Sequence, residues 1–286
     1  MLSLLGTYKS VLVKMRRIFV YLCDIIIIMS WASKRKTLYV SIVLGIIIII
    51  IFAFIYPVIF KEPTCRDGKQ NGSETGIDCG GACSLVCKEE SRDPVVLWSR
   101  AFPVIDGNYN FVALVENKNR DASLMEVSYE FKAYDSSNKF IGRREGKTFL
   151  PPNERFAIFE PRFKALDGEI KTVSFEFVPP YVWFKKEPKI QSLPIKVDNI
   201  TLENESISPL LRARVVNDSN YDLPSFSVVA IVYNIDGNAI NVSKTVKNGI
   251  KSGESIEVYF TWPVPFLETV VSFDVLPLFD PFTLPF

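Results

Sequence analysis

The side chains with the most versatile chemistry in this chain form one short cluster. Four of the five cysteines, Cys65, Cys79, Cys83 and Cys87, lie within 23 consecutive residues. Such a cluster forms disulfides in an oxidising compartment, and zinc binding is the alternative. We expect two disulfides, because the cluster has no C-x-x-C pair and the apolar segment described below places it outside the cytoplasm. Three pairings are possible, and the spacing does not choose among them.

Oxygen-bearing side chains fill the interval between the first two of these cysteines. If Asp67 is position 1 of a calcium loop, Asn71 takes position 5 and Asp78 takes position 12, with Glu74 as an additional donor. Lys69 at position 3 departs from the pattern, because a cation stands where a ligand belongs. These four oxygen donors are the candidate calcium ligands, and we expect no other cofactor. The alternative is a disulfide-stapled turn module in which the same side chains cap backbone groups.

The composition argues against an enzyme. Histidine is absent, which removes the commonest general base, the Ser-His and Cys-His nucleophile pairs and imidazole metal ligands. The sequence also has no G-x-S-x-G, no G-x-x-x-x-G-K-[ST] and no G-x-G-x-x-G motif. The enzymatic alternative is a surface hydrolase with a carboxylate pair. We expect no catalytic residues.

One segment is long and apolar enough to cross a membrane. Thr37–Phe60 has 24 residues without a charge, which is about 36 Å of helix against about 30 Å of hydrocarbon. The preceding Lys34-Arg35-Lys36 predicts a cytoplasmic N-terminus, because basic residues stay on the cytoplasmic side. We therefore expect a single-pass protein of the cell membrane that contacts lipid through Thr37–Phe60. A cleaved signal peptide is the alternative, but the run is too long for one and no A-x-A-like site follows.

The segment before this span is expected to be a cytoplasmic leader, residues 1–36. It contains a second apolar stretch, Ile18–Ser33, which Asp24 interrupts and which is short for a span. We interpret that stretch as interfacial or as the result of an early start codon, with Met29 as an alternative start. Cys23 lies in this leader and is expected to stay reduced.

The charge balance outside the membrane excludes a nucleic-acid surface. The chain has 33 basic and 32 acidic residues, of which seven and one lie in the first 60, leaving 26 and 31 beyond them. A net charge of about minus five with only scattered basic pairs is unlike the basic stripe that phosphate backbones require. We therefore expect a protein partner in the envelope or at the surface, and no nucleic acid.

Beyond residue 93 the hydrophobic pattern has period two, which predicts half-buried strands. Two blocks align at an offset of about one hundred residues: FVALVENKN with LRARVVNDS, FKAYDSSNKF with AIVYNIDGNAI, and LPPNERFAIF with IKSGESIEVYF. Asn117 then matches Asn217, and Glu154 matches Glu254. Each block has the size of a seven-stranded sandwich. Residues 135–138 and 236–238 supply hairpin turns.

These residues carry two resemblances. The string TCRDGKQNGSETGIDCGGACSLVC, residues 64–87, resembles the C-x-DG-x-x-N-x-x-E-T-x-x-DCGG-x-C modules of prokaryotic and other extracellular surface proteins. FKAYD at 131–135 resembles the F-x-L-Y-D signature of FxLYD-type domains, with Ala133 in place of leucine, and AIVYN at 230–234 is a looser version. Such domains are similar to late-embryogenesis-abundant type-2 β-sandwiches and to immunoglobulin-like surface modules. The resemblance implies extracellular, non-catalytic domains.

The predicted fold is mainly β, with one N-terminal transmembrane helix, a small disulfide-rich module and two tandem immunoglobulin-like or FxLYD-like β-sandwiches. The expected boundaries are 1–36 for the leader, 37–60 for the helix, 62–92 for a cysteine-rich neck module, 94–180 and 190–277 for the sandwiches, and 278–286 for an apolar tail. A proline-rich linker, 178–189, is expected to limit how the sandwiches orient. The tail either packs on its own domain or docks a partner.

We expect a membrane-anchored, extracytoplasmic binding or scaffold protein. The first alternative is a calcium-dependent adhesion or cell-wall-contact module built on the loop from Asp67 to Asp78. The second is the carboxylate-based surface hydrolase.

Overall fold

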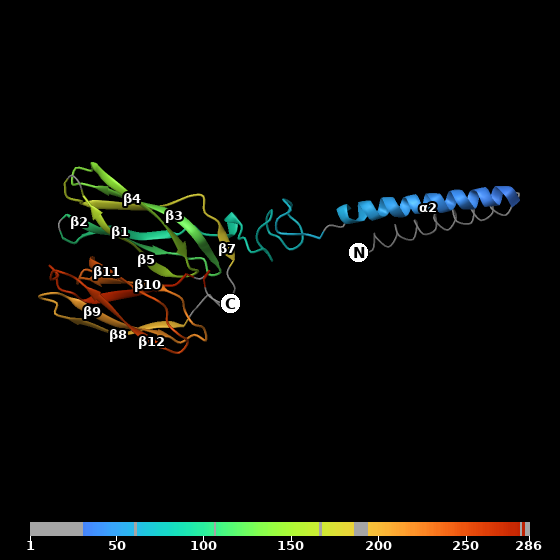
Figure 1. Cartoon of the computed structure of the whole chain (residues 1–286). Helices are drawn as coiled ribbons and strands as arrows, with labels where there is room; N and C mark the ends of the chain where they lie inside the picture. Colours follow the sequence, from blue (N-terminus) through green and yellow to red (C-terminus); the bar gives the residue numbers. More distant parts are fainter. Residues whose placement is uncertain are drawn as a thin grey trace, which may run out of the picture. The chain divides into compact units, whose positions relative to one another are not determined.

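The computed structural model describes residues 31–59, 62–105, 107–165, 168–185, 194–280 and 282–283. The described residues form a mainly β fold with one long helix, as the sequence predicts (Figure 1). The chain divides into two compact units, Met1–Pro63 and Thr64–Phe286. The first unit contains the described helix, and the second contains the four cysteines of the neck module and the described strands.

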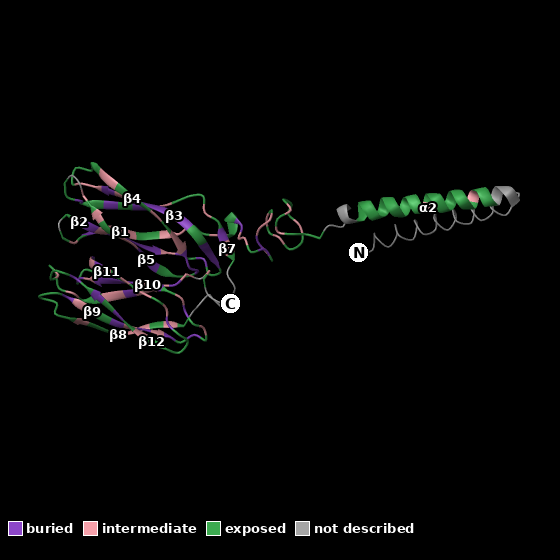
Figure 2. Cartoon of the chain, in the orientation of Figure 1, coloured by how far each residue is buried: buried purple, intermediate pink, exposed green. Residues whose placement is uncertain are grey.

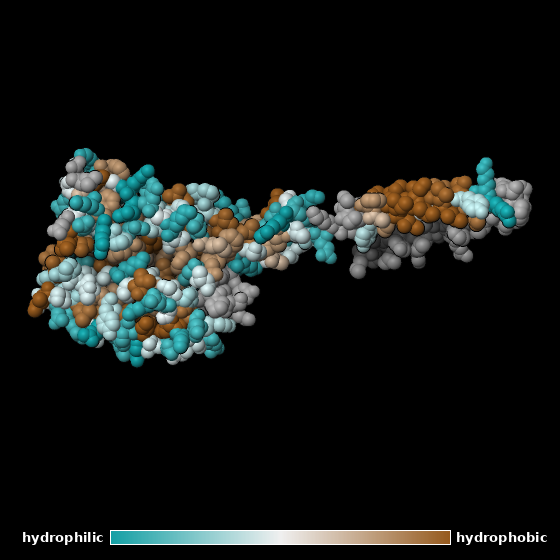
Figure 3. All heavy atoms as spheres, viewed as in Figure 1, coloured by the Kyte–Doolittle hydropathy of each residue, from teal (hydrophilic) through white to brown (hydrophobic). Residues whose placement is uncertain are grey.

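The helix α2 runs from Trp31 to Ile59. Its segment Arg35–Tyr56 is apolar and long enough to cross a membrane and is not buried in the protein (Figures 2 and 3). A helix pairs its backbone groups within the segment, as hydrocarbon surroundings require. The helix begins six residues before the predicted Thr37, so the basic cluster of residues 34–36 is its first part rather than a preceding coil. Residues 1–30, with Cys23 and Met29, and Phe60 lie outside the described residues.

The first sandwich, sandwich 1, consists of two antiparallel sheets. One has the order β1-β2-β5, with β1 Val95–Pro103, β2 Asn108–Glu116 and β5 Arg155–Lys164. The other has the order β4-β3-β6, with β3 Ala122–Tyr134, β4 Phe140–Leu150 and β6 Thr172–Val178, and β7 Trp183–Lys185 also pairs with β3.

The second sandwich, sandwich 2, has the same strand order. One sheet is β8-β9-β12, with β8 Ile195–Glu203, β9 Leu210–Asn217 and β12 Ser255–Thr261. The other is β11-β10-β13, with β10 Phe226–Tyr233, β11 Ala239–Lys247 and β13 Ser272–Leu278. Among the described residues, no strand of sandwich 2 corresponds to β7, so this domain has six strands rather than the predicted seven.

The alternating residues fill the two cores. Val127, Tyr129, Phe131 and Ala133 all point into the core of sandwich 1, with Phe131 and Ala133 fully buried. In sandwich 2 the corresponding positions of β10 pack against Leu211, Val215 and Phe260 from the opposite sheet. Period-two alternation therefore identifies the inner face of each sheet, as expected for sandwiches.

A third apolar cluster joins the two sandwiches. Val112 and Leu114 on the outer face of β2 pack in one cluster with Val229 and Ile231 on the outer face of β10, and all four are buried. Arg100 on β1 adds hydrogen bonds from its guanidinium to the Ala239 carbonyl and the Asn238 side chain, each at 3.0 Å. Strands β2 and β10 are therefore buried on both faces, which fixes the orientation that the linker alone was expected to limit.

The matched asparagines play the same part in both sandwiches. The Asn117 N–H donates to the Glu154 carbonyl at 2.9 Å, and the Asn217 N–H donates to the Glu254 carbonyl at the same distance. Each side-chain amide is buried and donates to carbonyls on the two chain segments beside it. These amides satisfy backbone acceptors that no strand partner reaches.

The described part of the C-terminal segment packs on the protein. The Phe279 ring stacks on Phe226 with centroids 4.4 Å apart and is buried in the core of sandwich 2. The Phe282 ring meets Phe184 of β7 edge to face. The predicted tail thus begins as a core segment, while residues 284–286 lie outside the described residues.

Candidate functional site

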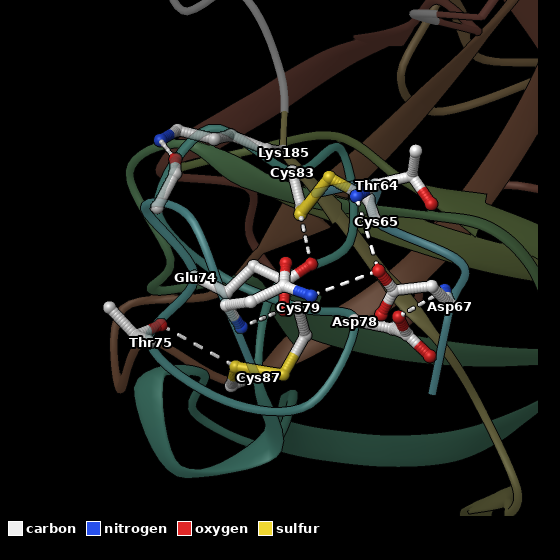
Figure 4. The surroundings of a disulfide bond; sticks show 12 residues. Thr64, Cys65, Asp67, Glu74, Thr75, Asp78, Cys79, Cys83, Cys87 and Lys185 are labelled. Carbon is white, nitrogen blue, oxygen red and sulfur yellow. Dashed lines mark hydrogen bonds between the residues drawn. A yellow bond between two sulfur atoms is a disulfide. The ribbon is translucent and has the colours of Figure 1, made fainter. Parts of the chain in front are cut away.

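The neck module, residues 62–92, has almost no apolar interior, and two disulfides hold it together. Cys65 pairs with Cys83, and Cys79 pairs with Cys87 (Figure 4). In chain order this is first to third and second to fourth, so the two covalent loops overlap. This settles which of the three possible pairings is present.

The four predicted calcium ligands make hydrogen bonds inside the module. The Asp78 carboxylate accepts the N–H groups of Asp67 and Gly68, both at 2.9 Å. Asp67 in turn accepts the Asn71 side-chain amide at 2.9 Å, and this bond holds the pKa of the Asp67 carboxyl below its ordinary value. Glu74 accepts the Asn71 N–H at 3.2 Å. These side chains therefore stabilise the module by accepting hydrogen bonds from its backbone N–H groups, in place of an apolar core.

Two glycines let the chain pass close to itself in this module. Gly81 has φ of +56°, and a Cβ there would lie 1.7 Å from the Ser73 carbonyl oxygen. A Cβ on Gly76 would lie 2.8 Å from the sulfur atoms of both Cys79 and Cys87. Both close approaches need a residue without a side chain, which explains glycine beside the cysteines.

The neck module docks on sandwich 1 through β7. The Val86 N–H donates to the Trp183 carbonyl at 3.0 Å, the Lys185 N–H donates to the Ser84 carbonyl at 2.6 Å, and Leu85 forms a bridge with Phe184. The Trp183 side chain is buried in the core of sandwich 1. β7 therefore pairs with β3 on one side and with the neck module on the other.

Two polar contacts complete this junction. Asn119, which is buried, accepts the Arg92 N–H and donates to the Arg92 carbonyl, both at 2.8 Å. The Tyr181 hydroxyl donates to the Asp93 carboxylate at 2.9 Å, and burial together with this bond raises the pKa of Tyr181 to about 12. The hydroxyl is thus a structural donor at neutral pH.

A hollow of about 440 Å³ lies at this junction. Val86, Pro180, Tyr181 and Trp183 line it, with Lys88 and Asp93 among the polar groups. A mainly apolar hollow with few polar groups suits binding by shape.

The geometry of the neck module bears on the calcium hypothesis in two ways, and one of them favours it: the Asn71 Oδ1 atom is buried and has no hydrogen-bond partner among the described residues. Among the described residues, the group of metal-ligating side chains within 4.8 Å of one another is Cys65, Glu74 and Cys83, and the two cysteines share a disulfide. Asp67 and Asp78 do not gather around a common point with Glu74, and their oxygens hold backbone N–H groups. The site of Asp67, Asn71, Glu74 and Asp78 remains a prediction.

Two structural features, strand β7 and the contact between the sandwiches, have sequence signals other than the period-two alternation. Strand β7 lies in the linker, where Pro179 and Pro180 suggested that no strand would form, yet Trp183 and Phe184 after them are typical strand residues. The runs FVALV and VVAIV are apolar at consecutive positions, which is the signal of burial on both faces. These runs identify the surfaces through which the sandwiches meet.

Comparisons with known proteins do not place the chain in a family. No protein-family model and no curated protein matches it. The crystal structure of red sea bream transglutaminase is 11% identical with a TM-score of 0.24, over 65% of this chain and 29% of that one. Bacteroides uniformis β-glucuronidase is 13% identical with a TM-score of 0.18, over 61% of this chain and 22% of that one.

Dimeric latent PorU from Porphyromonas gingivalis is 14% identical with a TM-score of 0.20, over 67% of this chain and 20% of that one. The chain spans less than a third of the length of each of these three proteins. Such low TM-scores carry no argument about fold or function.

Proposed function

We propose that this chain is a single-pass membrane protein whose two sandwiches lie outside the cytoplasm and bind or scaffold a protein of the envelope or surface. The observation that carries the proposal is the order of its parts. An exposed apolar helix is followed, a few residues later, by a module that two disulfides close and that docks on a folded β body. Disulfides persist in oxidising compartments, so the body belongs on the non-cytoplasmic side.

A binding role is supported by the way the polar groups are used. The buried polar side chains Asn117, Asn119, Asn217 and Ser219 all hold backbone groups. Such groups build a framework for the fold. We infer a non-catalytic protein whose contacts with its partner come from loops and strand faces.

We also infer that the sandwiches are two copies of one FxLYD-like domain. The shared strand order and the equivalent asparagine hydrogen bonds support this inference. In both copies the signature stretch leads to a tyrosine at the end of the central strand, Tyr134 in β3 and Tyr233 in β10, and then to the hairpin turn. The resemblance to late-embryogenesis-abundant type-2 and immunoglobulin-like modules is part of the same proposal.

Membrane topology can be tested with a maleimide reagent that does not cross bilayers. After mild reduction of intact cells, we expect labelling of the neck-module thiols, while Cys23 is labelled only after lysis. Without reduction, the neck-module thiols stay unlabelled because they are paired. Variants Cys23→Ser and Cys79→Ser/Cys87→Ser assign each signal. Labelling of the neck module only after lysis would overturn the proposal.

A further inference from the structure

Three loops meet where β8, β10 and β12 of sandwich 2 end: residues 204–209, 234–238 and 262–271, here called the apical loops. The Glu205 carboxylate accepts the Val270 N–H at 3.4 Å, and the Asn234 side-chain amide donates to Glu268 at 2.5 Å. The Val271 N–H donates to the Tyr233 carbonyl at 2.9 Å. These bonds join the apical loops into one surface.

This surface presents large apolar side chains to solvent. Ile207 is 74% exposed, Ile235 is 82% exposed and Leu267 is fully exposed at 102%, with Val264 and Val271 also exposed. Each of the three loops contributes at least one of them. Because they add nothing to a core, a gathering of this kind marks a contact surface.

The corresponding turn of sandwich 1 has the same hydrogen bonds but different side chains at its tip. Residues 135–139 read Asp-Ser-Ser-Asn-Lys, and the Asp135 carboxylate accepts the N–H groups of Ser137 and Lys139. In the equivalent turn of sandwich 2, the Asn234 Oδ1 atom accepts the N–H groups of Asp236 and Asn238 in the same way. The exposed tip of that turn carries Ile235, where sandwich 1 has a serine. The two turns therefore differ in the side chains that they expose, while sandwich 1 exposes Ile105 in the loop that corresponds to residues 204–209.

The charge of the apical loops has one sign. They contain the three acidic residues Glu205, Asp236 and Glu268, all exposed, and no lysine or arginine. An apolar surface with an acidic rim is repelled by anionic lipid and requires cations on its partner. The same chain supplies a surface of that kind.

A groove of about 260 Å³ lies where the two sandwiches meet, beside the apical loops. Its lining includes Pro103, Phe159, Arg162, Lys244, Trp262 and Val264, and no carboxylate among the described residues. Neither Arg162 nor Lys244 has an ion-pair partner in the described part of the chain. Val264 belongs to both the groove and the apical loops, so the two surfaces are continuous.

We propose that the apical loops of one molecule dock into this groove on a second copy of the chain, and the reverse. The apolar tips and acidic rim of one surface match the apolar walls and two cations of the other. Because each copy carries both surfaces side by side, a two-fold axis can satisfy both contacts at once and close the assembly as a dimer. The groove is smaller than the roughly 300 Å³ at which small-molecule sites begin, which suits one or two side chains.

This inference rests on the proposed binding role and names its partner, while the membrane topology is tested separately by thiol labelling. The full chain in detergent micelles is examined by sedimentation over a range of concentrations and salt. We expect a reversible dimer that weakens as salt rises. Leu267→Ser should weaken it about tenfold or more, since a leucine loses its burial in each half of the contact. Met125→Ser, at a 52% exposed apolar residue of sandwich 1, is the matched control and should change nothing.

Charge reversal provides the decisive comparison. Asp236→Lys and Lys244→Glu should each weaken the dimer by about fivefold, and the double variant should regain most of the loss. The proposal is overturned if the chain stays monomeric at every concentration, if Leu267→Ser leaves a dimer unchanged, or if the double variant is as weak as the singles. Leu267-dependent binding to anionic vesicles by a monomer would likewise overturn it in favour of a lipid partner.

Discussion

Sandwich 1 and sandwich 2 share a framework and differ at both ends. Their sheets have the same strand order, and Asn117 and Asn217 hold equivalent backbone groups. Sandwich 1 receives the neck module through β7 and has a polar turn at residues 135–139, whereas sandwich 2 is closed by Phe279 and exposes Ile235 in the equivalent turn. The comparison indicates that the core residues and the two asparagines determine the shared fold, whereas the ends and loops can differ between the two copies and carry different contacts.

The largest expected effect concerns the aromatic side chain that closes each sandwich. Trp183→Ala and Phe279→Ala should each lower the free energy of unfolding by about 3–5 kcal/mol, because both remove a buried ring. Urea unfolding followed by circular dichroism measures the loss. Phe184→Ala, at a half-buried ring of β7, is the milder control.

The two variants should differ in what else they disturb. Trp183→Ala should also speed reduction of the neck-module disulfides, because the buried side chain anchors β7, whose backbone holds Val86. Phe279→Ala should leave that rate unchanged. An equal effect of both variants on the neck module would break the distinction between the two ends.

The second effect tests the equivalence of the sandwiches. Asn117→Ala and Asn217→Ala should each lower the free energy of unfolding by about 2–3 kcal/mol, because each leaves buried carbonyls without a donor. Thermal unfolding of both variants gives the comparison, with Ser136→Ala, at an exposed turn residue, as the control. Costs that differ by more than the value of one hydrogen bond, about 1 kcal/mol, would show that the two asparagines are not equivalent.

The third effect is confined to the neck module, which sandwich 1 alone carries. Gly81→Ala should destabilise the folded neck module by about 2–3 kcal/mol, because the new Cβ meets the Ser73 carbonyl and the backbone must move. Gly68→Ala is the matched control: its φ is also positive, at +72°, but nothing lies within 4 Å, so only about 1 kcal/mol is expected. The rate at which a phosphine reduces the disulfides reports the opening. Similar rates for both variants would contradict the close approach.

The smallest effect is a pH dependence of the neck module. The Asn71 hydrogen bond lowers the pKa of Asp67 in the folded state. The ionised Asp67 carboxylate therefore stabilises the folded neck module at pH values above its ordinary pKa of 3.8. That contribution is lost as the pH falls through the lowered pKa, and phosphine reduction should then accelerate. Asp67→Asn should flatten this profile, while Asp135→Asn, in the hairpin of sandwich 1, should leave it intact. An unchanged profile in Asp67→Asn would exclude this carboxylate as the cause.

Much of the fold follows from local pattern. One example is β3, in which Val127, Tyr129, Phe131 and Ala133 alternate with polar residues. A strand with one buried face produces this alternation, so the sequence alone identifies it. The turn at Gly237 was equally legible, and its φ is +73°. The mainly β architecture, the helix and the two disulfides are confirmed for this reason.

The remaining features depend on contacts distant in sequence. The pairing of Cys65 with Cys83 is decided by turns such as the one at Gly81, which spacing does not encode. Strand β7 is three residues long and forms because β3 and the neck module both offer it a partner. The apical loops escape period-based analysis, because Ile235 and Leu267 belong to no periodic segment.

Strand β7 determines where the protein can be cut for study. A soluble fragment that begins at residue 94 would lack Ser84 and Val86, and the backbone of Trp183 and Lys185 would lose its partners on that side. An uncovered strand edge next to an aromatic pair invites pairing between fragments. A fragment that begins at Thr64 keeps this edge covered, so it is the shorter version of the protein that should remain in solution as a well-behaved species.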